Sequence, residues 1–101
     1  MNIVEIEHRG IRSLANGRPA RLPKDTELPI RKALKRLRDL PVLSEDVTTR
    51  RLLGVGQALW AISLTPIWEM HVWADDATSG ARIHGLHRDP IGNSHLLVQK
   101  H

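Results

Sequence analysis

Residues 59–74 read LWAISLTPIWEMHVWA, and this stretch sets the architecture that we expect for the chain. Apolar side chains alternate with others over 58–64 and again over 67–74, a period of two residues that is typical of β-strands. The Thr-Pro pair at 65–66 separates the two runs and predicts a turn. The stretch therefore predicts an antiparallel hairpin.

Working outward from the hairpin, the sequence predicts two more strands, at 50–55 before it and at 81–87 after it. Residues 2–7 are short and β-branched and predict an opening strand. Residues 8–16 carry apolar side chains three and four positions apart, which predicts a short helix ended by the Asn-Gly pair at 16–17.

The clearest helical pattern begins after Pro23 and ends before Pro41. Asp25 and Thr26 are two candidates for its N-cap. An apolar stripe of helical period comprises Leu28, Ile30, Ala33, Leu34, Leu37 and Leu40. A basic stripe comprises Arg31, Lys32, Lys35, Arg36 and Arg38. We therefore expect an amphipathic helix with a cationic outer face.

This order of elements is typical of an α+β domain with two layers. We predict an N-terminal strand and one or two helices packed on a three- to four-stranded antiparallel sheet, whose other face stays partly open. The 101 residues correspond to a single domain. For the C-terminal tail, residues 92–101, two alternatives are open: a flexible segment, or one that docks or pairs at an edge of the sheet.

The composition excludes several kinds of chemistry. The chain has no cysteine, so disulfides, thiolate zinc sites, iron–sulfur clusters and cysteine nucleophiles are ruled out, and it has no tyrosine. No segment resembles a signal peptide, and none approaches the ~18 apolar residues of a membrane span. We therefore expect a cytoplasmic protein that does not bind a membrane.

The charge is distributed unevenly along the chain. Residues 1–53 carry twelve basic and seven acidic side chains, a net charge of +5, whereas residues 54–101 carry three and four, a net charge of −1. A basic half predicts a polyanionic partner such as a nucleic acid. The alternative is a well-solvated helix surface in a basic protein.

Histidine and arginine gather on the last predicted strand. In a regular strand Arg82, His84 and Arg88 share one face and His87 lies on the other, unless a bulge intervenes. Two histidines three positions apart on a strand do not form a metal site, and no third ligand has a recognisable spacing. We therefore expect neither a metal nor another cofactor.

The hairpin contains a second candidate pair. Alternation places Glu69 and His71 on the same face of one strand, where they can act together as an acid–base pair. The alternative is an ordinary contact at the protein surface, with little effect on stability.

The chain resembles the RelE/HigB/ParE superfamily of bacterial toxins over about residues 3–91. The resemblance lies in the order of elements, in residues 82–90 (RIHGLHRDP), in residues 4–11 (VEIEHRGI) and in residues 59–64 (LWAISL). It implies a small basic toxin of a type II toxin–antitoxin module with the RelE-like fold.

The resemblance to the HigB-type members implies a ribosome-dependent mRNA endonuclease that needs no metal and inhibits translation. Such enzymes direct a ribose 2′-hydroxyl at the adjacent phosphate, with histidine as the acid or base and arginine as the phosphate ligand. It implies His84, His87 and Arg88 as catalytic residues. The RNA-binding residues that we predict are Arg31, Lys32, Lys35, Arg36, Arg38, Arg50, Arg51 and Arg82. The partners it implies are a cognate antitoxin of helix-turn-helix type, the ribosome and mRNA.

Two departures from the family keep other functions open. Glu69 stands where these toxins usually carry an arginine, and the tyrosine that many of them have near the end is missing. One alternative is a ParE-like protein that inhibits a target such as DNA gyrase by binding, without nuclease chemistry. Another is a small basic nucleic-acid-binding adaptor that is not toxic.

Overall fold

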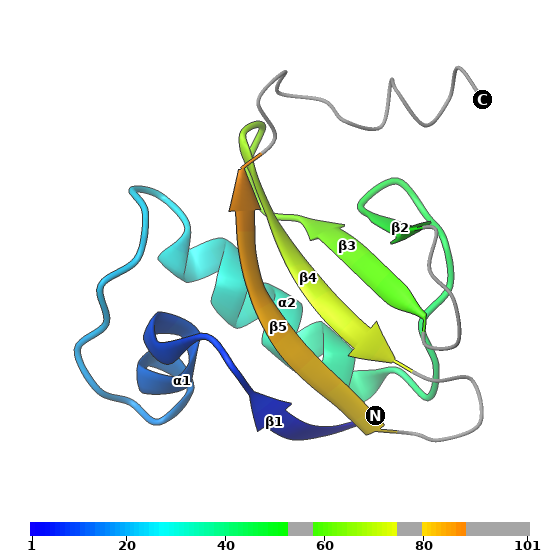
Figure 1. Cartoon of the computed structure of the whole chain (residues 1–101), viewed down its shortest axis with the longest axis horizontal. Helices are drawn as coiled ribbons and strands as arrows, with labels where there is room; N and C mark the ends of the chain where they lie inside the picture. Colours follow the sequence, from blue (N-terminus) through cyan, green and yellow to red (C-terminus); the bar gives the residue numbers. More distant parts are fainter. Residues whose placement is uncertain (53–57, 75–79, 89–101) are drawn as a thin grey trace.

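The computed structural model describes residues 1–52, 58–74 and 80–88, which form five strands and two helices. The elements are β1 (Asn2–Ile6), α1 (Arg9–Ala15), α2 (Glu27–Asp39), β2 (Thr49–Leu52), β3 (Leu59–Ser63), β4 (Trp68–Ala74) and β5 (Gly80–Arg88). They form one mixed sheet in the order β1-β5-β4-β3-β2, with α2 behind it and α1 to the left of it in the view of Figure 1.

The predicted α+β class is confirmed, but the predicted sheet was wrong in two respects. The sheet has five strands instead of three or four, and it is not wholly antiparallel because β1 pairs in parallel with β5. The apolar residues Ile3 and Ile6 of β1 pack against the core, so the first strand extends the sheet along the edge of β5. A local pattern predicts that a strand exists but does not identify the strand with which it pairs.

The hydrophobic core lies between the helices and one face of the sheet. Trp60, Val72 and Ile83 occupy matching positions on β3, β4 and β5, and all three are buried. Helix α2 contributes Ile30, Ala33, Leu34 and Leu37, and α1 contributes Ile11 and Leu14. Because side chains alternate along a strand, the residues between these core positions point to the opposite face.

The ends of the helices agree with the sequence in most details. Asn16 caps α1, and Gly17 follows with a φ of 71°, in the region that favours glycine. Thr26 is the N-cap residue of α2, and its hydroxyl donates to the carbonyl of Pro23 at 2.6 Å. Leu28 was predicted to join the apolar stripe, but it is 60% exposed because it lies in the first turn and points away from the sheet.

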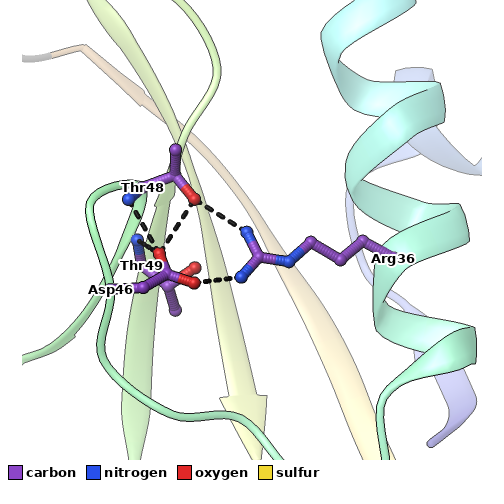
Figure 2. A network of polar contacts seen from close by, with 4 residues as sticks. All are labelled: Arg36, Asp46, Thr48 and Thr49. Atoms are coloured by element: carbon purple, nitrogen blue, oxygen red, sulfur yellow. Dashed lines mark hydrogen bonds and ion pairs between the residues drawn. The ribbon is translucent and has the colours of Figure 1, made fainter.

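A polar network joins α2 to the start of β2 (Figure 2). Asp46 accepts hydrogen bonds from the backbone N–H groups of Thr48 and Thr49, at 2.8 and 2.9 Å. The guanidinium of Arg36 donates to the Asp46 carboxylate and, at 2.7 Å, to the hydroxyl of Thr48. The network fixes the chain immediately before Arg50, whose role is described next.

Candidate active site on the open face of the sheet

The open face is the sheet face that points away from both helices. Arg50, Ala61, His71 and Gly85 occupy matching positions across β2, β3, β4 and β5, one residue away from the core positions. Glu69 and His87 form the neighbouring matched pair on β4 and β5. The sheet itself therefore brings together titratable side chains from β2, β4 and β5, and Arg50 and His87 among them are 37 positions apart in the sequence.

A buried ion pair lies at the centre of this face. The guanidinium of Arg50 donates to both carboxylate oxygens of Glu69, at 2.9 and 3.3 Å. The Nε2 atom of His71 lies 2.8 Å from Glu69 Oε1. Glu69 is only 8% exposed and His71 only 9% exposed. The two side chains that the sequence places on one face are therefore in contact, and they are buried rather than at the surface.

The neighbours of Glu69 determine its charge. Burial alone would raise the pKa of this carboxyl, but hydrogen bonds from His71 and Arg50 and their positive charge outweigh burial and lower the pKa to about 2. Glu69 is therefore ionised near neutral pH and can only accept a hydrogen bond. It follows that Nε2 of His71 is the ring nitrogen that donates the hydrogen of this bond.

Three histidine rings are stacked beside this ion pair. The rings of His71 and His87 have centroids 3.8 Å apart and planes that differ by 13°. The rings of His87 and His84 follow at 5.7 Å and 19°. His84 also contacts Trp73 edge-on at 6.3 Å, and its Nδ1 lies 2.9 Å from the Glu7 carboxylate. We call His71, His87 and His84 the histidine stack.

A β-bulge makes the histidine stack possible. His71 is opposite Gly85 while Val72 is opposite Ile83, so His84 is an extra residue on β5. Simple alternation would place His84 and His87 on opposite faces, but the extra residue shifts the alternation by one. His84 and His87 therefore meet on the open face, whereas in an unbroken strand only one of them would lie there.

His87, the middle ring, has an unusual environment. Burial lowers its pKa, the positive charges of His71 and His84 lower the pKa further, and the charge of Glu69 partly opposes them. His87 is therefore neutral near pH 7 and can accept a proton. An imidazole with this property is suited to general-base catalysis.

The other predicted site residues do not form one surface. Arg82 is opposite Trp73 and belongs to the open face, with His84 and His87. Arg88 is opposite Trp68, and alternation assigns it to the face that bears the helices, at the exposed end of β5. Arg50 and Arg51 are divided in the same way: Arg51 is opposite Trp60 on the face that bears the helices, where it is exposed and its guanidinium carbon lies 5.7 Å from the centre of the Trp60 ring.

The cationic side chains of α2 lie on the other side of the molecule. Helix α2 lies behind the sheet in Figure 1, and its buried stripe belongs to the core, so its basic stripe points outward, away from the open face. Two of the five cations are engaged within the chain: Arg31 pairs with Glu27 at 3.3 Å, and Arg36 belongs to the network with Asp46. The predicted RNA-binding residues thus occupy two opposite surfaces.

Sequence reasoning missed Glu7 and the true partner of Arg50. Glu7 is 77 residues from His84, and only the parallel pairing of β1 with β5 brings them together. Arg50 was predicted to bind RNA, whereas the structure pairs it with Glu69. The usable signal was the pair of Glu69 and His71 on one face of an apolar strand, where a carboxylate needs a cationic partner.

Three further findings complete the description. Among the described residues, no three or more histidine, aspartate or glutamate side chains are arranged to hold a metal ion. No helix in the described part of the chain is long and apolar enough to cross a membrane. Comparisons with protein-family models, with curated proteins and with solved structures found no match.

Proposed function

We propose that this protein is a metal-independent endoribonuclease that cleaves RNA by attack of a ribose 2′-hydroxyl on the adjacent phosphate. The observation that carries the proposal is the histidine stack, braced by Glu69 and Arg50 on the open face. RNA cleavage of this kind needs one group that takes a proton, one that gives a proton, and positive charge near the phosphate. The open face carries histidines for the two proton transfers and Arg82 as a source of positive charge.

In the proposed mechanism His87 is the general base. Its lowered pKa leaves it neutral near pH 7, so it can take the proton of the 2′-hydroxyl. The 2′-oxygen then forms a bond to phosphorus while the bond from phosphorus to the 5′-oxygen breaks. The protonated form of His84, 5.7 Å away, gives its proton to the departing 5′-oxygen. The products are a 2′,3′-cyclic phosphate and a 5′-hydroxyl end.

Arginine side chains supply the positive charge in this scheme. Arg82 belongs to the open face and Arg88 to the exposed end of the same strand, so each can approach a phosphate of the same RNA strand. A guanidinium stays charged at every working pH and binds phosphate oxygens in pairs. Arg50 instead neutralises Glu69, which would otherwise repel the substrate.

The biological setting that we propose follows the resemblance to HigB-type toxins. The protein would act in the cytoplasm on mRNA bound to the ribosome, and a helix-turn-helix antitoxin would neutralise it. The outward cations of α2, above all Lys32, Lys35 and Arg38, would bind ribosomal RNA or the antitoxin on the surface opposite the histidine stack. This arrangement would leave the open face accessible to mRNA.

The test is cleavage of a labelled single-stranded RNA, with and without ribosomes, in the presence of a metal chelator. We expect wild-type protein to produce 2′,3′-cyclic phosphate ends, and we expect His87→Ala and His84→Ala each to lose about a hundredfold or more in rate. Ser63→Ala, on the open face opposite Glu69, is the matched control and should cleave normally. Circular dichroism should show that all four proteins are folded.

Expression in a bacterial host distinguishes the second candidate function. The division of the cations between two surfaces favours a ParE-like inhibitor in one respect, because α2 can bind a target without the histidine stack. Growth arrest with new mRNA ends that disappear in His87→Ala supports the nuclease. Growth arrest that persists in His87→Ala, without new ends, would support inhibition by binding. Normal growth would contradict the assignment as a toxin.

A further inference from the structure

Two titratable side chains are buried on the sheet face that points away from α1 and α2. Glu69 and His71 point away from the core, yet each side chain is only 11% exposed. Both are connected to His87: Glu69 is opposite His87 in the strand register, and His71 stacks on the His87 ring at 3.8 Å. The proposed cleavage step uses His84 and His87 and leaves this buried pair without a role.

We propose that Arg50, Glu69 and His71 are positioning residues that fix the ring plane and the protonation state of His87. The inference rests on the proposed function only in that it explains how the general base is prepared. Arg50 holds the carboxylate, the carboxylate holds His71, and His71 holds the ring of His87.

We call the chain of contacts from Arg50 through Glu69 and His71 to His87 the relay, in which each group fixes the next one. The guanidinium of Arg50 donates to both carboxylate oxygens of Glu69, so the carboxylate cannot rotate freely. The ionised carboxylate accepts from Nε2 of His71 at 2.8 Å, which selects one ring orientation and fixes the position of one ring hydrogen. The planes of His71 and His87 then differ by only 13°, so the orientation of the first ring constrains that of the second.

The charges around His87 influence its protonation state as well as its position. Among the described residues, His71 and Glu69 of β4 face His87, and His84 is its neighbour on β5. Arg50 of β2 reaches this group through Glu69, and Glu7, next to β1, reaches it through His84. Burial first, and then the charges of His71 and His84, lower the pKa of His87, while Glu69 partly offsets them. Protonation of His71 therefore disfavours protonation of His87.

The decisive variant is His71→Phe, which keeps a ring in the stack and removes its charge and its hydrogen bond to Glu69. We would follow the ring signals of His87 by nuclear magnetic resonance from pH 5 to pH 8 in wild type, His71→Phe and the control Ser63→Ala. The relay predicts that the His87 titration midpoint moves to higher pH in His71→Phe and stays in place in Ser63→Ala. The acidic limb of the pH profile of RNA cleavage should move in the same direction.

The second variant is Glu69→Gln, which keeps the shape of the side chain and removes its charge. The relay predicts a loss of about tenfold to a hundredfold in kcat with little change in KM, because the base is misplaced while the substrate still binds. The ring-to-ring cross-peak between His71 and His87 should weaken in this variant. An unchanged kcat and an unchanged cross-peak would overturn the positioning role of Glu69.

The two proposals can fail separately in these experiments. If wild-type protein cleaves RNA and the His87 midpoint does not move in His71→Phe, the relay is wrong and the proposed nuclease stands. If the midpoint moves but no form of the protein cleaves RNA, the proposed nuclease is wrong while the control of His87 by His71 is supported.

Discussion

Replacing Glu69 by glutamine should change how the stability of the protein depends on acid. Its neighbours lower the pKa of Glu69 from 4.5 to about 2, although burial opposes them. A lowered pKa means that the ionised form stabilises the folded state, and this contribution is present above about pH 4.5 and is lost as the pH falls toward 2. The difference between 4.5 and about 2 corresponds to about 3 kcal/mol of stability at neutral pH.

The size of the effect at a given pH follows from the same two values. At pH 3 about 2 kcal/mol of this contribution is lost, and at pH 2 about 3 kcal/mol is lost. The Glu69→Gln variant lacks this contribution at every pH, because glutamine does not titrate. At pH 7 the variant should be less stable than wild type by about 3 kcal/mol, since Arg50 keeps its buried position but loses its charged partner. At pH 3 the difference should shrink to about 1 kcal/mol.

Urea unfolding at pH 7 and at pH 3, followed by tryptophan fluorescence, measures this change directly. Asp46 also has a pKa lowered to about 2, first by its hydrogen bond from the Thr48 backbone, but it contributes equally to both proteins and cancels in the comparison. If the stability difference between wild type and Glu69→Gln is the same at both pH values, Glu69 is not held as an ion by Arg50 and His71. The description of the site would then be wrong at its centre.

Three other predictions concern the frame around the site. Gly10→Ala normally favours a helix, but the new Cβ would lie 2.7 Å from the carbonyl oxygen of Arg21, so we expect a loss of about 1 kcal/mol in thermal unfolding; a stabilised variant would contradict this close approach. Asp46→Ala should cost about 1–2 kcal/mol in urea unfolding and Asp46→Asn clearly less, because asparagine keeps an acceptor for two backbone N–H groups; equal losses would argue against that role. Burial lowers the pKa of His8, whose Nδ1 accepts the N–H of Ile11, so stability should be full above about pH 6.5 and fall as the pH drops below it. In His8→Asn, which caps without titrating, stability measured between pH 7.5 and pH 5.5 should fall less steeply than in wild type.

Much of the fold was predictable because its elements have strong local signals. The hairpin of β3 and β4 follows from alternation over 58–64 and 67–74, and α2 follows from its apolar stripe and its flanking prolines. The parallel pairing of β1 with β5 was not predictable in this way. Ile3 and Ile6 identify a strand with a buried side, but nothing in the sequence near them identifies the partner strand, which is some 75 residues away.

The candidate site was predictable as a set of residues but not as an arrangement. The pattern indicated that Glu69 and His71 share a face and that histidines gather on the last strand. It could not show that His84 is the extra residue of a β-bulge. A bulge depends on how two strands pair over several residues, and the change of face it produces is invisible in the spacing of one strand.

Glu69 also changes how the departure from the toxin pattern is understood. A glutamate at the position where toxins of the proposed family carry an arginine first suggests a loss of the positive charge that binds phosphate. The sheet, however, pairs Glu69 with Arg50 from β2, so the position carries an ion pair with no net charge. The Glu69 carboxylate also accepts a hydrogen bond from His71, and His71 stacks on the ring of His87. Under the proposed mechanism, Glu69, which departs from the pattern, prepares the base, and Arg82 and Arg88 supply the charge for the phosphate.

A double variant, Arg50→Glu with Glu69→Arg, reverses this ion pair. It should fold better than either single variant, because the two charges are again opposite. His71 would lose its acceptor at position 69, so RNA cleavage should stay low.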